Sequence, residues 1–192
     1  MKKAFFDEKK AQEAIKLLLE SFGEDLNREG LKRTPQRVAQ FYKEALAGNN
    51  INPLDFASVA YSDENYEEIV LLKDISFYSI CEHHLLPFFG KAHIAYIPKK
   101  NKIIGISKLI KLIEVFASRL QLQERMSKQI ADALMKAASP QGAAVVLEAE
   151  HLCMSMRGVK KTGASVITSA MRGIFLKDMR ARAEVMALLK GK

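Results

Sequence analysis

The sequence predicts an α+β domain, in which an antiparallel sheet carries two long helices on one face, preceded by a helical N-terminal segment. Two observations predict this fold class. Apolar residues recur with a helical period in the first quarter of the chain, whereas four later segments have the apolar character of strands. Two of these strands precede a pair of amphipathic helices and two follow it, an order typical of helices packed on an antiparallel sheet. With 192 residues, 48% of them hydrophobic, the chain is long enough to bury a core.

The N-terminal segment contains two predicted helices. Residues 7–22 place an apolar stripe on one side, with acidic residues in the first turn and Gly23 just beyond the end. Thr34 followed by Pro35 predicts the N-cap and first residue of a second helix, which is expected to run to Gly48.

A polar, turn-rich connection over residues 48–66 separates this segment from the rest of the chain. We therefore expect an N-terminal helical appendage and linker over 1–66 and the main domain over 67–192. The chain has no apolar run of 18 residues, and its first ten residues place charges on both sides of a Phe pair, unlike a signal peptide. These features predict a cytoplasmic protein that does not enter the membrane.

The main domain alternates between the two kinds of pattern. Ser107 is the expected N-cap of its first helix, and a short break near 119–123 separates that helix from the second. A terminal helix is expected over 179–190. The predicted strands cover 69–80, 89–97, 142–152 and 164–175.

The net charge of +8 is unevenly distributed. Residues 1–90 carry a net −4, whereas 91–140 and 141–192 carry +7 and +5. Such an excess is typical of nucleic-acid binding, of a polyanionic small ligand or simply of a solvated basic face. The chain has no basic tail and no recognised nucleic-acid-binding motif, and its basic residues are interspersed among patterned segments.

The two cysteines point to metal binding or catalysis, because two cysteines make no disulfide framework and the cytoplasm keeps thiols reduced. Cys81-Glu82-His83-His84 and His151-Leu152-Cys153 each stand at the end of a predicted strand. Either motif alone is commonly a buried structural Cys beside a surface His. Their pairing favours a metal site, since Zn²⁺ prefers Cys and His ligands.

The number of ligands separates two kinds of zinc site. A structural site takes four protein ligands, whereas a catalytic site takes three and leaves a position for water. Two Cys and one His give three ligands, so the residues alone predict a zinc-dependent hydrolase or a deaminase-like enzyme. The H-x-E and C-x-x-C spacings of zinc deaminases do not occur in the chain.

Two polar pairs near the predicted helix starts have alternative interpretations. Gln123-Glu124 could bind the amide edge of a guanine or be a solvated helix start. Ser107-Lys108 could bind a phosphate at a helix N-terminus or be an ordinary N-cap. Arg157 and the Lys160-Lys161 pair could belong to a surface patch.

Five segments in order resemble the GTP cyclohydrolase I family, and the resemblance runs from about residue 8 to 190. They are RTPQRVAQFY, SICEHHLLPFFGKAHIAYIP, IIGISKL, LQLQERMSKQIADAL and GAAVVLEAEHLCMSMRGVKKTGASVITSAMRGIF. The resemblance implies a T-fold catalytic domain over 67–192 that converts GTP and water to 7,8-dihydroneopterin triphosphate and formate. This reaction is the first step of tetrahydrofolate and pterin biosynthesis. It also implies a homodecameric ring with active sites between adjacent subunits, and no nucleic-acid or membrane partner.

The resemblance also implies roles for individual residues. The zinc ligands would be Cys81, His84 and Cys153. Proton transfer during opening of the imidazole ring would fall to His83 and His151, and the ribose rearrangement to Ser107 together with His83.

The substrate-binding residues follow from the same resemblance. Gln123 and Glu124 would recognise the guanine, and the triphosphate and ribose would be held by Ser107, Lys108, Arg157 and Arg37. Lys111 stands where many members of the family carry an Arg, so it is not assigned to the triphosphate, and Lys160-Lys161 receive no role.

Two other hypotheses stay open at this point. One is a basic nucleic-acid-binding protein with a structural zinc, which would need a fourth ligand. The other is a different T-fold enzyme, such as the nitrile reductase of queuosine synthesis, in which one cysteine would be the nucleophile.

Overall fold

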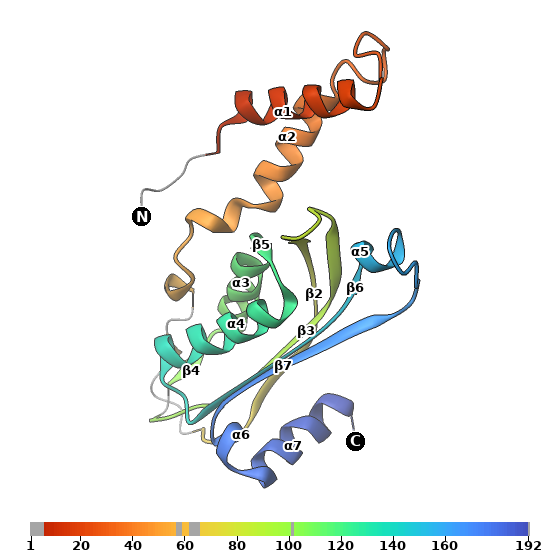
Figure 1. Cartoon of the computed structure of the whole chain (residues 1–192). Coiled ribbons are helices and arrows are strands. Elements are labelled where there is room, and N and C mark those ends of the chain that lie inside the picture. Colours follow the sequence, from red (N-terminus) through yellow and green to blue (C-terminus); the bar gives the residue numbers. More distant parts are fainter. Residues whose placement is uncertain (1–5, 57–58, 62–65, 101, 192) are drawn as a thin grey trace.

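The computed structural model describes residues 6–56, 59–61, 66–100 and 102–191. It confirms the α+β class, with a curled sheet that carries two long helices on one face (Figure 1). The first five residues and part of the predicted linker lie outside the described residues.

The main sheet has five strands in the order β5-β2-β3-β6-β7. All neighbours are antiparallel except β5, which pairs in parallel with the end of β2. The four long strands confirm the predicted ones, whereas the two-residue β5 was not predicted because it is too short to show a pattern. The bounds are β2 Val70–Cys81, β3 Pro87–Ile97, β5 Leu120–Gln121, β6 Gly142–His151 and β7 Ser165–Gly173.

Helices cover both faces of this sheet, but unequally. The core on one face lies under α3 (Ile106–Ala117) and α4 (Gln123–Ala138), which fill the two predicted helical segments. On the opposite face, α6 (Ile174–Lys177) and α7 (Met179–Lys190) cover one end of the sheet, where Val185 is fully buried. The sequence predicted the terminal helix but not the face that it covers.

Two predicted helix starts are wrong by one or two residues. The N-cap of α2 (Thr34–Ala45) is Arg33, and the Thr34 hydroxyl donates to the Gly30 carbonyl at 3.3 Å. The N-cap of α3 is Gly105, so Ser107 lies inside the first turn. In both places the N-cap lies before the residue whose side chain was expected to cap the helix. The second helix also ends earlier than expected, and a 3₁₀ helix, η1 (Ala47–Asn50), follows it.

The N-terminal helices α1 (Glu8–Ser21) and α2 lie beside one another at one end of the molecule (Figure 1). The helix predicted over 7–22 is confirmed, with the Asp7 carboxylate as its N-cap accepting from the Lys10 backbone N–H at 3.0 Å. The domain boundary at residue 66 stays a prediction.

The connection after α2 is anchored on the C-terminal end of α3. The Gly48 N–H donates to the Ser118 carbonyl at 2.9 Å, and a Cβ at Gly48 would lie 2.2 Å from the Val115 carbonyl oxygen. The Arg119 guanidinium donates to the carbonyls of Gly48 and Ile51, each at 3.0 Å. Only glycine fits this close approach.

The start of α3 lies at the other end of the domain. A small second sheet pairs β1 (Val59–Tyr61) with β4 (Ile103–Ile104), and a short 3₁₀ helix, η2 (Pro53–Asp55), precedes it. The Ile104 N–H donates to the Tyr96 hydroxyl at 2.9 Å, which ties the beginning of α3 to the far end of β3.

Candidate active site

A tight turn between β2 and β3 presents the first Cys/His motif. The Leu85 N–H donates to the Cys81 carbonyl, and the Cys81 N–H donates to the Leu86 carbonyl, both at 2.9 Å. Leu85 has a φ of 56°, a left-handed conformation that closes the turn. Cys81 is buried at the strand end, whereas His83 and His84 are exposed on the turn.

The second motif reaches the same place from a neighbouring strand. In the pairing of β3 with β6, His151 lies opposite Phe88, next to the β2–β3 turn. Helix α5 (Leu152–Ser155) begins directly after His151 and carries Cys153. The hairpin tip and α5 therefore meet at one end of the sheet (Figure 1).

Three side chains form a group that could hold a metal ion. One ligand atom from each of Cys81, His84 and Cys153 lies within 4.8 Å of the others. Burial, and then the neighbouring Cys81, raise the pKa of the Cys153 thiol. A divalent cation would reverse this shift, because metal binding favours the thiolate. The geometry and the donor types fit a metal centre.

His151 is held next to this group by two contacts. Its ring stacks on Phe88, with centroids 4.6 Å apart and planes at 4°. Its Nε2 lies 2.7 Å from the Gln123 side-chain oxygen. Burial lowers the pKa of the His151 imidazole, an effect that the Glu124 carboxylate opposes.

A pocket of about 200 Å³ gathers the predicted residues at this end of the sheet. Arg157 adjoins it, since its Nη1 donates to His84 Nε2 at 3.0 Å. Six of the residues singled out in the sequence line the pocket: Cys81, His83, Gln123, Glu124, His151 and Cys153.

The predicted residues at the start of α3 are not part of this pocket. Ser107 and Lys108 follow Ile104, which contacts Tyr96, and Tyr96 lies eight residues beyond Phe88 on β3. At about 3.3 Å per residue, that separation is about 26 Å along the strand. The other end of α3 is the one near the pocket, since the Ala117 carbonyl accepts from the Ser79 hydroxyl at 2.7 Å.

Two more predictions concern basic residues outside the pocket lining. Arg37 is exposed on α2 and is not among the residues that line the pocket. The Lys108 backbone N–H donates to the Gly105 carbonyl at 2.9 Å, so this N–H already has a partner within the helix. Lys111, to which no role was assigned, places its ammonium 5.8 Å from the centre of the Phe56 ring.

Arg125 and Glu82 support the pocket but were not predicted as site residues. The Arg125 guanidinium forms an ion pair with Glu82 in the β2–β3 turn and donates to the Gln121 side-chain oxygen at 3.1 Å. The hydrogen bond from Arg125 lowers the pKa of the Glu82 carboxyl. Arg125 directly follows Gln123-Glu124 in the sequence. Its partner Glu82 lies 43 positions earlier, so no local pattern indicates the ion pair.

The N-terminal segment also contacts the turn. The Tyr42 hydroxyl on α2 donates to the Leu85 carbonyl at 3.1 Å. No pattern in the sequence predicted this contact.

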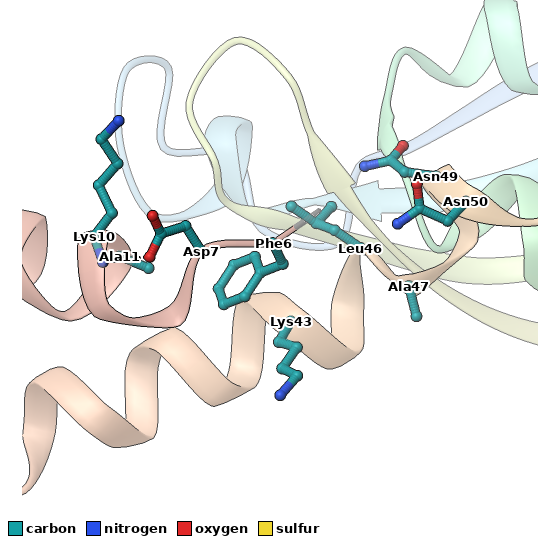
Figure 2. Close-up of a pocket in the computed structure, with 9 residues that line it drawn as sticks. All are labelled: Phe6, Asp7, Lys10, Ala11, Lys43, Leu46, Ala47, Asn49 and Asn50. Atoms are coloured by element: carbon teal, nitrogen blue, oxygen red, sulfur yellow. Dashed lines mark hydrogen bonds between the residues drawn. The ribbon is translucent and has the colours of Figure 1, made fainter. Parts of the chain in front are cut away.

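A larger hollow lies elsewhere, between the start of α1 and the end of α2 (Figure 2). Its volume is about 760 Å³, and Phe6, Leu46 and Lys43 are among the residues that line it. None of the predicted site residues lines this hollow, and its lining contains neither Cys nor His. The smaller pocket is therefore the better candidate for chemistry.

The fold and the pocket together define a class of protein. A group of three side chains that could hold a metal ion, beside histidines at one end of a sheet, is an arrangement found in metalloenzymes. Over the ranges that the structure describes, the chain contains no helix long and apolar enough to span a membrane.

Comparisons with known proteins identify the family. The family model described as GTP cyclohydrolase I matches residues 11–190. A GTP cyclohydrolase 1 of Carboxydothermus hydrogenoformans is 56% identical over 183 residues, covering 95% of each chain. One of Clostridioides difficile is 54% identical over 186 residues, covering 97% of this chain and 98% of the relative. The chain therefore belongs to the GTP cyclohydrolase I family of enzymes, which confirms the resemblance.

Proposed function

We propose that the protein is a zinc-dependent GTP cyclohydrolase I, which converts GTP and water to 7,8-dihydroneopterin triphosphate and formate. The observation that carries the proposal is the convergence of Cys81, His84 and Cys153 with two further histidines around one pocket, in a member of this family. We place the reaction in the cytoplasm, at the first step of tetrahydrofolate and pterin biosynthesis.

Zinc is the metal that this donor set favours, because two thiolates and one imidazole suit a borderline-soft ion. Cys81, His84 and Cys153 would hold it and leave one coordination position open. When bound, zinc supplies a Lewis acid that activates water for hydrolysis at neutral pH. A purely structural role fits less well, because the group contains three ligands rather than four.

The two other histidines of the pocket are assigned to proton transfer. His151, which lies against Phe88, would protonate the guanine N7 and make the adjacent C8 more electrophilic. His83, on the exposed turn, would act with Ser107 in the rearrangement of the opened ribose. An imidazole can both take up and release a proton, which suits both tasks.

Recognition of the base is assigned to the start of α4, where the resemblance implied Gln123 and Glu124. Glu124 is exposed in the first helical turn and lines the pocket. Its carboxylate would accept hydrogen bonds from the ring N–H and the exocyclic amine of guanine, a pair of donors that adenine lacks. Such a paired contact is the means by which the enzyme would select GTP.

Binding of the triphosphate requires more than one chain in this proposal. Arg157 lies next to His84, but Ser107 and Lys108 are at the opposite end of the same domain and Arg37 lies on α2. A triphosphate beside the pocket would therefore meet Ser107 and Lys108 only if another subunit supplied them. This separation supports a homo-oligomer with shared active sites, which we propose to be the decameric ring of the family.

A direct assay tests the proposal. Purified, zinc-loaded protein should release formate from GTP and develop the ultraviolet absorbance of a dihydropterin, and chelation should abolish both signals. Protein that is fully loaded with zinc and leaves GTP unchanged would refute the assignment. Salt-sensitive binding to DNA or RNA by that inactive protein would instead favour the nucleic-acid-binding alternative.

A further inference from the structure

We propose that Gln123 is a positioning residue for His151: it keeps the proton on Nε2 of the imidazole and leaves Nδ1 as the ring nitrogen that meets the substrate. The inference rests on the proposed function for the importance of His151. Its structural part concerns only the protein's own hydrogen bonds.

The orientation of the Gln123 amide is determined by two strands. The side chain is 1% exposed, and its nitrogen donates to the Leu147 carbonyl at 3.0 Å and to the Val166 carbonyl at 2.8 Å. A flipped amide would place its oxygen against two carbonyl oxygens in a buried site, which is unfavourable for all three groups. The amide oxygen must therefore face His151.

This orientation determines where the imidazole carries its proton. An amide oxygen only accepts hydrogen bonds, so His151 Nε2, 2.7 Å away, must donate. The neutral ring then has an unprotonated Nδ1, which must take up a proton before it can deliver one to the guanine N7. Stacking on Phe88 fixes the plane of the ring, and the hydrogen bond to Gln123 fixes its rotation within that plane.

Adjacent residues at the start of α4 consequently have different tasks. Both amide hydrogens of Gln123 are used within the chain, so its side chain has no donor for a base. Glu124, which follows it, is exposed and lines the same pocket. We therefore assign direct recognition of guanine to Glu124 and the alignment of His151 to Gln123.

The first test compares two substitutions in the full-length, zinc-loaded protein. Gln123→Met keeps the shape of the side chain and removes its hydrogen bonds. We expect kcat to fall by about 10- to 100-fold, the usual cost of losing a partner that orients a functional histidine, with little change in the KM for GTP. The matched control is Gln141→Met, which removes a similar amide bond, to the Pro98 carbonyl at 3.2 Å, outside the pocket lining.

The second test needs no substitution at Gln123. Solid-state ¹⁵N NMR of histidine-labelled protein, with His151 assigned by difference from a His151→Gln sample, reports which ring nitrogen carries the proton. We expect a protonated Nε2 and an unprotonated Nδ1. A neutral His151 ring with its proton on Nδ1 in the wild-type protein, or a raised KM with unchanged kcat in Gln123→Met, would overturn the inference. Failure of the wild-type protein to release formate would refute the proposed function and leave the NMR result intact.

Discussion

The two ends of the α+β domain hold their predicted site residues in different ways. At the pocket end, strand pairing places Phe88 opposite His151, and side chains such as Gln123 and Arg125 hold the neighbouring groups in place. At the other end, Ser107 is exposed in the first turn of α3 and lies far along β3 from the pocket. The pocket end gathers its predicted residues within a single chain, whereas in our proposal the other end contributes to the site of another chain.

The largest expected effect comes from removing a ligand at the pocket end. Cys153→Ser should lose both zinc and activity, with turnover falling by at least about 10³-fold, because the metal would keep only two protein ligands. Elemental analysis and formate release measure the two losses. His93→Gln is the control, since His93 accepts a hydrogen bond from the Asp74 N–H and is not in the metal-binding group. Full turnover with retained metal in Cys153→Ser would show that Cys153 is not a ligand.

Sharing of the two ends between subunits is tested by mixing two inactive variants. Cys153→Ser disables the pocket end and Lys108→Ala disables the start of α3, so co-expressed chains should regain roughly a quarter of the wild-type activity if each site draws on both ends from different subunits. The matched control combines Cys153→Ser with His151→Ala, which damage the same end and should give no recovery. Absence of recovery in the first mixture, with mixed oligomers present, would mean that active sites are not shared.

A smaller effect is expected for recognition of the base. Glu124→Ala should raise the KM for GTP by about 10- to 100-fold, the cost of removing a charged hydrogen-bonding partner, while the melting temperature stays nearly unchanged because Glu124 is exposed. Steady-state kinetics and a thermal melt measure the two quantities. A wholesale loss of folding would show that Glu124 is structural instead.

The smallest effect concerns the contact between the helical segment and the pocket. Tyr42→Phe removes the hydrogen bond to the Leu85 carbonyl and should lower kcat/KM by only about two- to fivefold, since an exposed hydrogen bond contributes about 1 kcal/mol. Tyr78→Phe, on a ring that is 74% exposed, is the control. Equal effects of the two substitutions would mean that α2 does not support the turn.

The sequence predicted the long strands because their patterns are local, and it predicted the Cys/His group because both motifs stand at strand ends. Helix starts at Thr34 and Ser107 were wrong because the backbone before a helix decides where it begins. No local pattern predicts the ion pair of Arg125 with Glu82 or the separation of Ser107 from the pocket. Both depend on tertiary structure.

The short strand β5 limits how this sequence can change. It pairs Leu120 and Gln121 with Ile80 and Cys81, and α4 begins two residues later at Gln123. One residue inserted between β5 and α4 would rotate the helix by about 100° and swing Gln123 away from His151. Residues 158–163, which follow Arg157, are exposed and lie outside the strand pairing. Insertions should therefore be tolerated within 158–163. Selection should remove insertions between β5 and α4.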